Sequence, residues 1–402
     1  MNERVITPLH RGFLFLDAHP TGCRAAVEQM WKSVAAPRCS AHAARRPTVL
    51  VIGSSAGFGL AATIVALARH RAQGVGVCLE KAPARRTGTA GWYRTAATAD
   101  LASQADLPFV FVNGDAFSDT VKQQTADVLN RRFGPVDHLI YSVAAPRRTD
   151  PDTNEVYTSA VRPIGRPHTT KTLAFDDGRP VITTVTTKAA SPAEITQTVA
   201  VMGGADWQRW ITTLAARGLL ADGITTCALS YIGPPLIERI HRKGTIGAAK
   251  AHLQDTADAW NALLAARHGG RAFISLNSAA VTQSSTAIPG IALYLGLLRG
   301  VLGDAMASPT AQMVELWDQL TGRADLRTDP QGRIRLDHRE LDQATQDTIA
   351  GRWHSATNDN IASLADLDWL TSEIHRLYGF DVPGVDYDTA SDVDIPWPAT
   401  AD

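Results

Sequence analysis

Short apolar segments alternate with longer stretches of helical periodicity over the first part of the chain. Four of these segments are rich in β-branched residues or bounded by glycine, as buried strands are: residues 48–53, 74–80, 109–115 and 137–145. Residues 60–70 and 118–134 have the apolar spacing of helices, and the second of these begins with Ser118 and ends at Gly134. Continuous apolar strands separated by helices predict a parallel sheet that is covered on both faces.

Residues 147–204 interrupt this alternation because they are polar, rich in Thr and Pro, and lack long helical periodicity. We interpret them as an insertion with a short hairpin, which is either a lid over a substrate site or a surface excursion without function. The pattern returns over 205–305, and 306–402 has the features of a more polar helical extension. We therefore predict one α/β domain over 1–402, a Rossmann-type doubly wound parallel sheet with a core formed by 48–146 and 205–305.

Composition and charge exclude several classes of protein. The formal net charge of the 402 residues is −1, which gives no overall field to attract nucleic acid or an anionic membrane. The four cysteines are scattered, so neither a zinc site nor a disulfide framework is predicted, and reduced thiols in the cytoplasm are expected. The first residues lack the apolar core of a signal peptide, and no run of about 18 apolar residues predicts a membrane-spanning helix.

A glycine-rich loop follows the first predicted strand and precedes its helix. Gly53, Gly57 and Gly59 have the spacing G-x-x-x-G-x-G. Glycines in this context let a pyrophosphate approach the backbone, and the helix start supplies free N–H groups. We interpret the loop as a dinucleotide site, and a tight turn in an ordinary α/β protein is the alternative.

An acidic residue, Glu80, ends the second predicted strand. A carboxylate there can accept hydrogen bonds from the adenosine ribose and repels a 2′-phosphate, which favours NADH. Lys81, Arg85 and Arg86 follow closely and are compatible with a phosphate, so NADPH is the less favoured alternative.

Many separated motifs together resemble the FabV class of trans-2-enoyl thioester reductases, which are large relatives of the short-chain dehydrogenases. The resemblance extends almost from end to end. It is carried by "RGFLFLDAHPTGC", "VLVIGSSAGFGLA", "GDAFSD", "YSVAAPRRTDP", "VMGGADWQRWI", "SYIGP", "GTIGAAK", "NSAAVTQSSTAIPGIALY", "GRIRLD" and "YGFDVPGVDYD". It implies a cytoplasmic, monomeric enoyl reductase of fatty acid biosynthesis, without nucleic-acid partners, metal or membrane insertion.

The resemblance also implies roles for individual residues. The expected cofactor contacts are Gly53, Ser54, Ser55, Ala56, Gly57, Phe58 and Gly59 at the phosphates, Leu79 and Glu80 at the ribose, Asp115 and Ala116 at the adenine, Val143 and Ala144 at the nicotinamide, and Ala280, Val281 and Thr282 at the carboxamide. Lys250 is expected to bind the cofactor ribose, and Tyr231 is expected to contact the substrate thioester.

One position departs from the family pattern. The catalytic tyrosine of the family precedes the lysine with eight residues between them, and here His241 occupies that position in "IHRKGTIGAAK". Three interpretations stay open. His241 replaces the tyrosine as proton donor, with activity favoured at lower pH; or Tyr231 takes over proton delivery and His241 shapes the pocket; or ordinary enoyl reduction is impaired and another unsaturated substrate is used.

The expected reaction is NADH-dependent reduction of the α,β double bond of an enoyl thioester, carried by CoA or acyl carrier protein. Hydride goes to Cβ and a proton to Cα, so the protein must stabilise the enolate between the two steps. The alternatives are a reductase, dehydrogenase or isomerase for another unsaturated carbonyl compound, and a nucleotide-binding homologue that is catalytically impaired by the change to His241.

Overall fold

The centre of the molecule is a seven-stranded sheet in which every pair of neighbouring strands is parallel. The computed structural model describes residues 2–11, 14–35, 45–176 and 179–399. In spatial order the strands are β14 (Ile334–Arg335), β13 (Arg271–Leu276), β12 (Leu220–Ser230), β7 (Val136–Tyr141), β4 (Thr48–Ile52), β5 (Gln73–Cys78) and β6 (Phe109–Asn113). Strand order reverses beside β4, which confirms the predicted doubly wound sheet.

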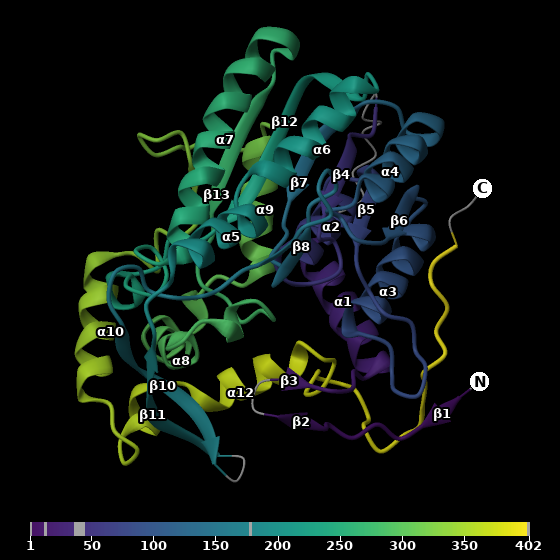
Figure 1. Ribbon diagram of the computed structural model, residues 1–402. Coiled ribbons are helices and arrows are strands. Elements are labelled where there is room, and N and C mark those ends of the chain that lie inside the picture. Colours follow the sequence, from purple (N-terminus) through teal and green to yellow (C-terminus); the bar gives the residue numbers. More distant parts are fainter. Residues whose placement is uncertain (1, 12–13, 36–44, 177–178, 400–402) are drawn as a thin grey trace.

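Helices cover both faces of this sheet (Figure 1). One face carries α1 (Pro20–Val34), α2 (Gly57–Ala68) and α9 (Pro309–Leu320), with α3 (Ala90–Gln104) packed on α1. The other carries α4 (Asp119–Arg132), α6 (Ala205–Ala216) and α7 (Thr245–His268), with α5 (Pro192–Met202) packed on α7. Within β4, Val49 and Val51 join one apolar cluster while Leu50 and Ile52 join the other. Because both faces are buried, the strand is apolar throughout.

A second body of helices lies at one end of the sheet (Figure 1). It comprises α8 (Ile291–Leu302), α10 (Gln343–Ser355), α11 (Ile361–Leu364), α12 (Leu367–Arg376) and the antiparallel hairpin β10 (His168–Asp176)–β11 (Arg179–Thr187). Residues 291–298 of α8 are all buried, which explains why this helix is apolar on every side.

Short elements complete the chain. β1 (Glu3–Arg4) pairs with β15 (Ser391–Asp392), so segments near the two ends of the chain lie side by side. The other antiparallel pairs are β2 (His10–Arg11) with β3 (Leu14–Phe15) and β8 (Arg147–Thr149) with β9 (Val156–Thr158). Single 3₁₀ turns span Pro235–Ile237, Ser285–Ala287 and Gly303–Ala305.

The observed elements correct the predicted borders in three places. Strand β14 and helix α9 belong to the sheet layers, so these layers continue past residue 305, where the sequence pattern placed the helical extension. The insertion contains the expected hairpin, but it also contains α5, which begins at a capping box of Ser191 and Glu194. Helix α1 was not predicted at all.

Two further expectations concern cysteines and membrane spans. Cys23, Cys78 and Cys227 are buried free thiols, and Cys39 lies outside the described residues. Among the described helices, none alone has the length and apolar composition to cross a membrane. One pair of helical segments, 291–305 and 309–320, has them only when both segments are counted together, and the two are bent by 62° relative to each other.

Candidate active site

The carboxyl edge of the sheet brings the predicted cofactor residues together. In a parallel sheet all strands end at the same edge, and this edge is where such folds bind ligands. The glycine loop follows β4, Leu79 follows β5, and Asp115 follows β6. On the other side of the strand reversal, Val143 follows β7 and Tyr231 follows β12. The sites predicted from separate motifs therefore belong to one edge.

The glycine loop has the backbone geometry of a phosphate cradle. Gly53 has φ +88°, and a Cβ atom there would lie 2.1 Å from the carbonyl oxygen of Ser142. A Cβ at Gly59 would lie 1.9 Å from the Gly53 oxygen, so only glycine fits at both positions. Helix α2 begins at Gly57 after Ala56, which gives its N-terminus no side-chain cap. Its first N–H groups are therefore available to an anion.

Glu80 is anchored beside this loop. The hydroxyl of Ser55 donates to Glu80 Oε1 at 2.5 Å, and the hydroxyl of Thr89 donates to Oε2. The Asn113 side chain bonds both the N–H and the carbonyl of Glu80, at 2.8 and 3.0 Å. Next to it, Leu79 is 68% exposed. A carboxylate held in one orientation can accept hydrogen bonds from ribose hydroxyls, and the exposed side chain of Leu79 beside it can contact the adjoining base.

The Asp115–Ala116 turn rests on a buried ion pair. Lys122 Nζ donates to the Ala116 carbonyl at 2.8 Å and to Asp206 Oδ1 at 2.7 Å, and neither charged side chain is more than 1% exposed. Tyr141 donates to Asp206 Oδ2 at 3.0 Å. Burial lowers the pKa of Lys122 and raises the pKa of Asp206. Sequence reasoning missed Lys122, because a lysine within an amphipathic helix resembles a solvated one.

The segment 280–282 lies against the glycine loop. A Cβ placed on Gly57 would lie 3.5 Å from Thr282 Cγ2, so the two segments are in contact distance. Ala280 and Val281 are buried, and Thr282 Oγ1 accepts a hydrogen bond from the N–H of Ser285 at 3.0 Å. The residues expected at the carboxamide therefore lie beside the glycine loop.

His241 is buried next to Tyr231. Its side chain is 3% exposed, and the two ring centroids are 5.1 Å apart at an interplanar angle of 68°. Burial lowers the pKa of His241 to about 4, the charge of Lys250 lowers this pKa further, and a backbone hydrogen bond with Ile232 opposes both. Nδ1 of His241 has no hydrogen-bond partner in the described part of the chain. The imidazole is therefore neutral near neutral pH, which argues against a role as a strong acid.

Lys250 lies in the second turn of α7. Burial lowers the pKa of its ammonium group to about 8, so the group is still mostly charged at neutral pH. No ion pair of Lys250 occurs among the described residues. A half-buried cation without a carboxylate neighbour of its own is suited to hold hydroxyl groups of a ligand.

A buried carboxylate, Glu340, completes the site and was missed from the sequence. It is fully buried and accepts four hydrogen bonds. Tyr231 and Tyr294 donate to Oε1 at 2.7 and 2.9 Å, whereas the Ser278 hydroxyl and the Ala279 N–H donate to Oε2 at 2.9 and 2.5 Å. Burial raises the pKa of Glu340, and these hydrogen bonds oppose that shift. It lies in "DHRELD", 109 residues after Tyr231, where no local motif marks it.

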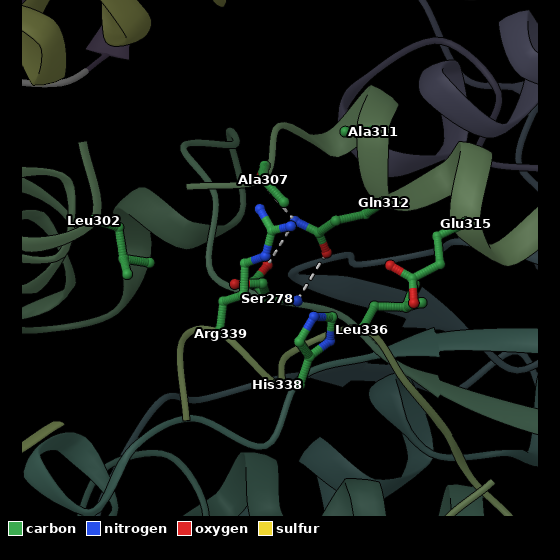
Figure 2. Close-up of a pocket in the computed structure, with 9 residues that line it drawn as sticks. All are labelled: Ser278, Leu302, Ala307, Ala311, Gln312, Glu315, Leu336, His338 and Arg339. Atoms are coloured by element: carbon green, nitrogen blue, oxygen red, sulfur yellow. Dashed lines mark hydrogen bonds between the residues drawn. The ribbon is translucent and has the colours of Figure 1, made fainter. Parts of the chain in front are cut away.

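A cavity of about 230 Å³ has Ser278 in its wall, and Tyr231 is not one of its lining residues. Figure 2 shows its lining, which consists of Ser278, Leu302, Ala307, Ala311, Gln312, Glu315, Leu336, His338 and Arg339. Gln312 fixes Ser278 there, because its Oε1 accepts from the Ser278 N–H at 2.8 Å and its Nε2 donates to the Ala307 carbonyl at 3.1 Å. His338 and Arg339 are exposed, so the cavity opens to solvent on their side.

The fold and site define a class of protein. A doubly wound parallel sheet with a glycine cradle and an oriented acid after the second core strand is the arrangement of a nucleotide-dependent oxidoreductase. Three family models match the chain. Residues 5–85 match the NAD(P)H binding domain of trans-2-enoyl-CoA reductase, residues 86–321 match its catalytic region, and residues 328–392 match the enoyl reductase FAD binding domain.

Full-length relatives agree with these models. An enoyl-[acyl-carrier-protein] reductase [NADH] from Streptomyces avermitilis is 55% identical, over 97% of this chain and 99% of its own length. The trans-2-enoyl-CoA reductase from Clostridium acetobutulicum in complex with NADH is 34% identical with a TM-score of 0.91, and the alignment covers 98% of both chains. The corresponding Treponema denticola enzyme in complex with NAD is 35% identical, with a TM-score of 0.89 and coverage of 96% and 97%. The chain belongs to the trans-2-enoyl-CoA reductase family.

The third family model is named for FAD binding, but residues 328–392 of this chain do not have the features of a flavin site. Ile349, Trp353, Leu370 and Ile374 are buried in the same apolar cluster as α8. They provide a packed apolar face rather than a nucleotide cradle. The segment instead supplies Glu340 to the site.

Proposed function

We propose that this protein is an NADH-dependent reductase of the α,β double bond of enoyl thioesters, carried by CoA or acyl carrier protein, in fatty acid biosynthesis. The observation that supports it most is the continuous carboxyl edge, where a phosphate cradle, Glu80, Lys250 and Tyr231 occur together in a chain related over its full length to named enoyl reductases. Bound NADH would supply the hydride that is added to Cβ.

The residues proposed to hold NADH follow its length along the edge. Gly53 to Gly59 would hold the pyrophosphate, Leu79 and Glu80 the adenosine ribose, and Asp115 and Ala116 the adenine. Val143, Ala144 and the segment 280–282 would hold the nicotinamide end. The uncapped start of α2 and the oriented carboxylate of Glu80 support this placement.

Tyr231 is proposed as the group that faces the thioester carbonyl. Reduction at Cβ moves negative charge onto this oxygen, and one donor in such a place is worth about 2.7–4 kcal/mol. Lys250 would hold the cofactor ribose and add positive charge nearby. His241, neutral and packed against the Tyr231 ring, would shape the pocket. Of the three interpretations of His241, this assignment favours proton delivery through Tyr231.

The decisive test follows NADH oxidation with crotonyl-CoA and longer enoyl thioesters, each offered on CoA and on acyl carrier protein. Turnover of at least one series, with a large loss in Tyr231→Phe and a small loss in His241→Ala, is expected. NADH binding without oxidation of any enoyl thioester would instead indicate a nucleotide-binding module or a reductase for a different unsaturated carbonyl compound. Unchanged kinetics of Tyr231→Phe would remove Tyr231 from the mechanism.

A monomer in the cytoplasm is also proposed. The resemblance to monomeric family members supports the first, and the three free, buried thiols in the described chain are compatible with a reducing compartment. Light scattering coupled to gel filtration would test the mass: the monomer of 43.1 kDa is expected, and twice that mass would contradict it.

A further inference from the structure

The site lacks a conventional proton donor at position 241, so the proton for Cα needs another source. The imidazole of His241 is neutral and a neutral ring is a very weak acid. Tyr231 carries a single proton, which is consumed if it is given to the substrate. Its hydroxyl therefore needs a partner that restores this proton in every turnover.

Glu340 is the hydrogen-bonding partner of that hydroxyl. The distance from Tyr231 Oη to Glu340 Oε1 is 2.7 Å, which is short enough for a proton to pass between the two oxygens. The carboxyl group is completely buried, and neither arginine nor lysine donates to it among the described residues. A carboxyl in such surroundings can exist in both protonation states, because burial favours its acid form and four donors favour its anion.

The second carboxylate oxygen of Glu340, Oε2, is connected through Ser278 to the cavity that opens to solvent. Oε2 accepts from Ser278 Oγ at 2.9 Å, and Ser278 is part of the wall of the cavity in Figure 2. The cavity has room for several water molecules, because each occupies about 30 Å³ in the liquid, and exposed His338 and Arg339 line its open side. The serine hydroxyl can donate and accept at once, as a member of a proton chain must.

We propose that Ser278 and Glu340 form a proton relay that carries protons from water in this cavity to Tyr231. The proposal rests on the proposed function, since it supplies the proton that enoyl reduction consumes. It identifies Ser278 and Glu340 as residues of the reaction, although they come from segments that are 62 residues apart in the chain.

After hydride addition to Cβ, Tyr231 gives its hydroxyl proton to Cα of the enolate and takes the proton of the Glu340 carboxyl from Oε1. The carboxylate that remains is stabilised by the four donors of the described structure. The carboxylate regains a proton on Oε2 from Ser278 Oγ, which takes one from cavity water. A half-turn of the carboxyl group then brings the protonated oxygen to the side of Tyr231, ready for the next turnover. One hydride and one proton are consumed for each double bond.

Tyr294 provides a matched control within the same network. Its hydroxyl donates to the same Oε1 atom at 2.9 Å and accepts from Gln346 Nε2 at 3.0 Å, but its side chain is completely buried and is not part of the cavity wall. Ser278→Ala and Tyr294→Phe therefore each remove one hydroxyl from Glu340, and only the first interrupts the route to the cavity.

The experiment measures kcat and its solvent deuterium isotope effect with NADH and crotonyl-CoA for the full-length wild type, Ser278→Ala, Tyr294→Phe and Glu340→Gln. Losses of kcat up to about 10²-fold, the lower end of general acid catalysis, are expected in Ser278→Ala and Glu340→Gln. In Ser278→Ala the isotope effect should also rise above the wild-type value, because proton supply becomes slower. Tyr294→Phe should show no such rise. NADH affinity, measured by fluorescence, should be unchanged in Ser278→Ala.

The outcomes separate the relay from the enzyme activity. If the wild type turns over and Ser278→Ala keeps both its kcat and its isotope effect, the relay is wrong while the proposed function stands. The relay is also wrong if Tyr294→Phe raises the isotope effect as much as Ser278→Ala, because the effect would then come from the ionisation of Glu340 alone. If the wild type oxidises no NADH with any enoyl thioester, the proposed function fails and the relay fails with it. Because Glu340→Gln can also perturb folding, Ser278→Ala decides the case.

Discussion

The imidazole of His241 stands edge-on to the phenol ring of Tyr231, with ring centroids 5.1 Å apart. The residue that departs from the family pattern is therefore in contact with the residue proposed to face the substrate. Both rings are held in place, because Tyr231 is hydrogen-bonded to Glu340 and His241 is 3% exposed. A change at one of these positions must act on the other, which makes the pair a sensitive place to test the chemistry.

A phenol at position 241 should increase the rate. In His241→Tyr, kcat for crotonyl-CoA at neutral pH is expected to rise about tenfold or more, because a positioned acid typically contributes about 10²–10⁴-fold. The larger ring must fit beside Tyr231, so thermal unfolding should report a loss of stability of about 1–3 kcal/mol. His241→Phe is the matched control, since it has the shape without the hydroxyl. Equal rates for the Tyr and Phe variants would show that the hydroxyl has no part in proton transfer.

The pH dependence should reflect Lys250 rather than His241. Burial places the pKa of Lys250 at about 8, so its charge is present below that pH and is lost as the pH rises through it. The value of kcat/KM is therefore expected to fall through this range. His241 has a pKa of about 4, so its protonation contributes no rise in activity between neutral and mildly acidic pH. The pH profile of Lys250→Arg, whose charge persists, should lose the alkaline fall; a fall of the same size in that variant would assign it to another group.

The residues proposed to hold the cofactor could be found from the sequence, because they belong to local patterns. The strand, the glycine loop and the helix that follows it are contiguous in the chain, and Gly53 has the positive φ that its place in the turn requires. Glu80 lies two residues after the end of the next strand, close to the strand end that the sequence predicted. Each of these features depends on neighbours in sequence, and the sheet topology then brings them to one edge.

The residues proposed to supply the proton could not be found from the sequence, since their arrangement depends on contacts between distant segments. Glu340 reaches Tyr231 across 109 residues and lies among ordinary polar residues, so its complete burial has no signature in the sequence. The low pKa of His241 has the same origin, because it results from tertiary burial and not from the residue itself. Strand β14 was missed because two residues are too short to show a periodic pattern.

Cofactor choice provides a further prediction at Glu80. Glu80→Gln removes the charge that opposes a 2′-phosphate and leaves an amide of similar size beside Ser55 and Thr89. The ratio of kcat/KM for NADPH to that for NADH should rise about tenfold, equivalent to about 1.4 kcal/mol. Thr89→Val, which removes a hydrogen bond to the carboxylate but keeps its charge, is the control and should change this ratio much less. An unchanged ratio in Glu80→Gln would place the discrimination elsewhere.

The buried pair of Lys122 and Asp206 should be required for both stability and cofactor affinity. Replacing Lys122 by Met leaves Asp206 uncompensated, and breaking a buried pair in this way costs about 3–5 kcal/mol in the free energy of unfolding. It also removes the ammonium group from the Ala116 carbonyl, so the dissociation constant for NADH should increase.

A double-mutant cycle separates the ion pair from general damage to the core. Asp206→Asn, alone and combined with Lys122→Met, should give a double variant at least about 1 kcal/mol more stable than the sum of the two single losses, because residues in direct contact are coupled. Arg209→Met is the surface control: this arginine of α6 pairs with Asp119 of α4 and with Asp152 in the turn between β8 and β9, and exposed pairs of this kind contribute about 0–1 kcal/mol. Urea unfolding of the wild type and the four variants measures these differences. Strictly additive losses would mean that the charge of Asp206 is not compensated by Lys122, and the support assigned to the Ala116 turn would then have to come from other contacts.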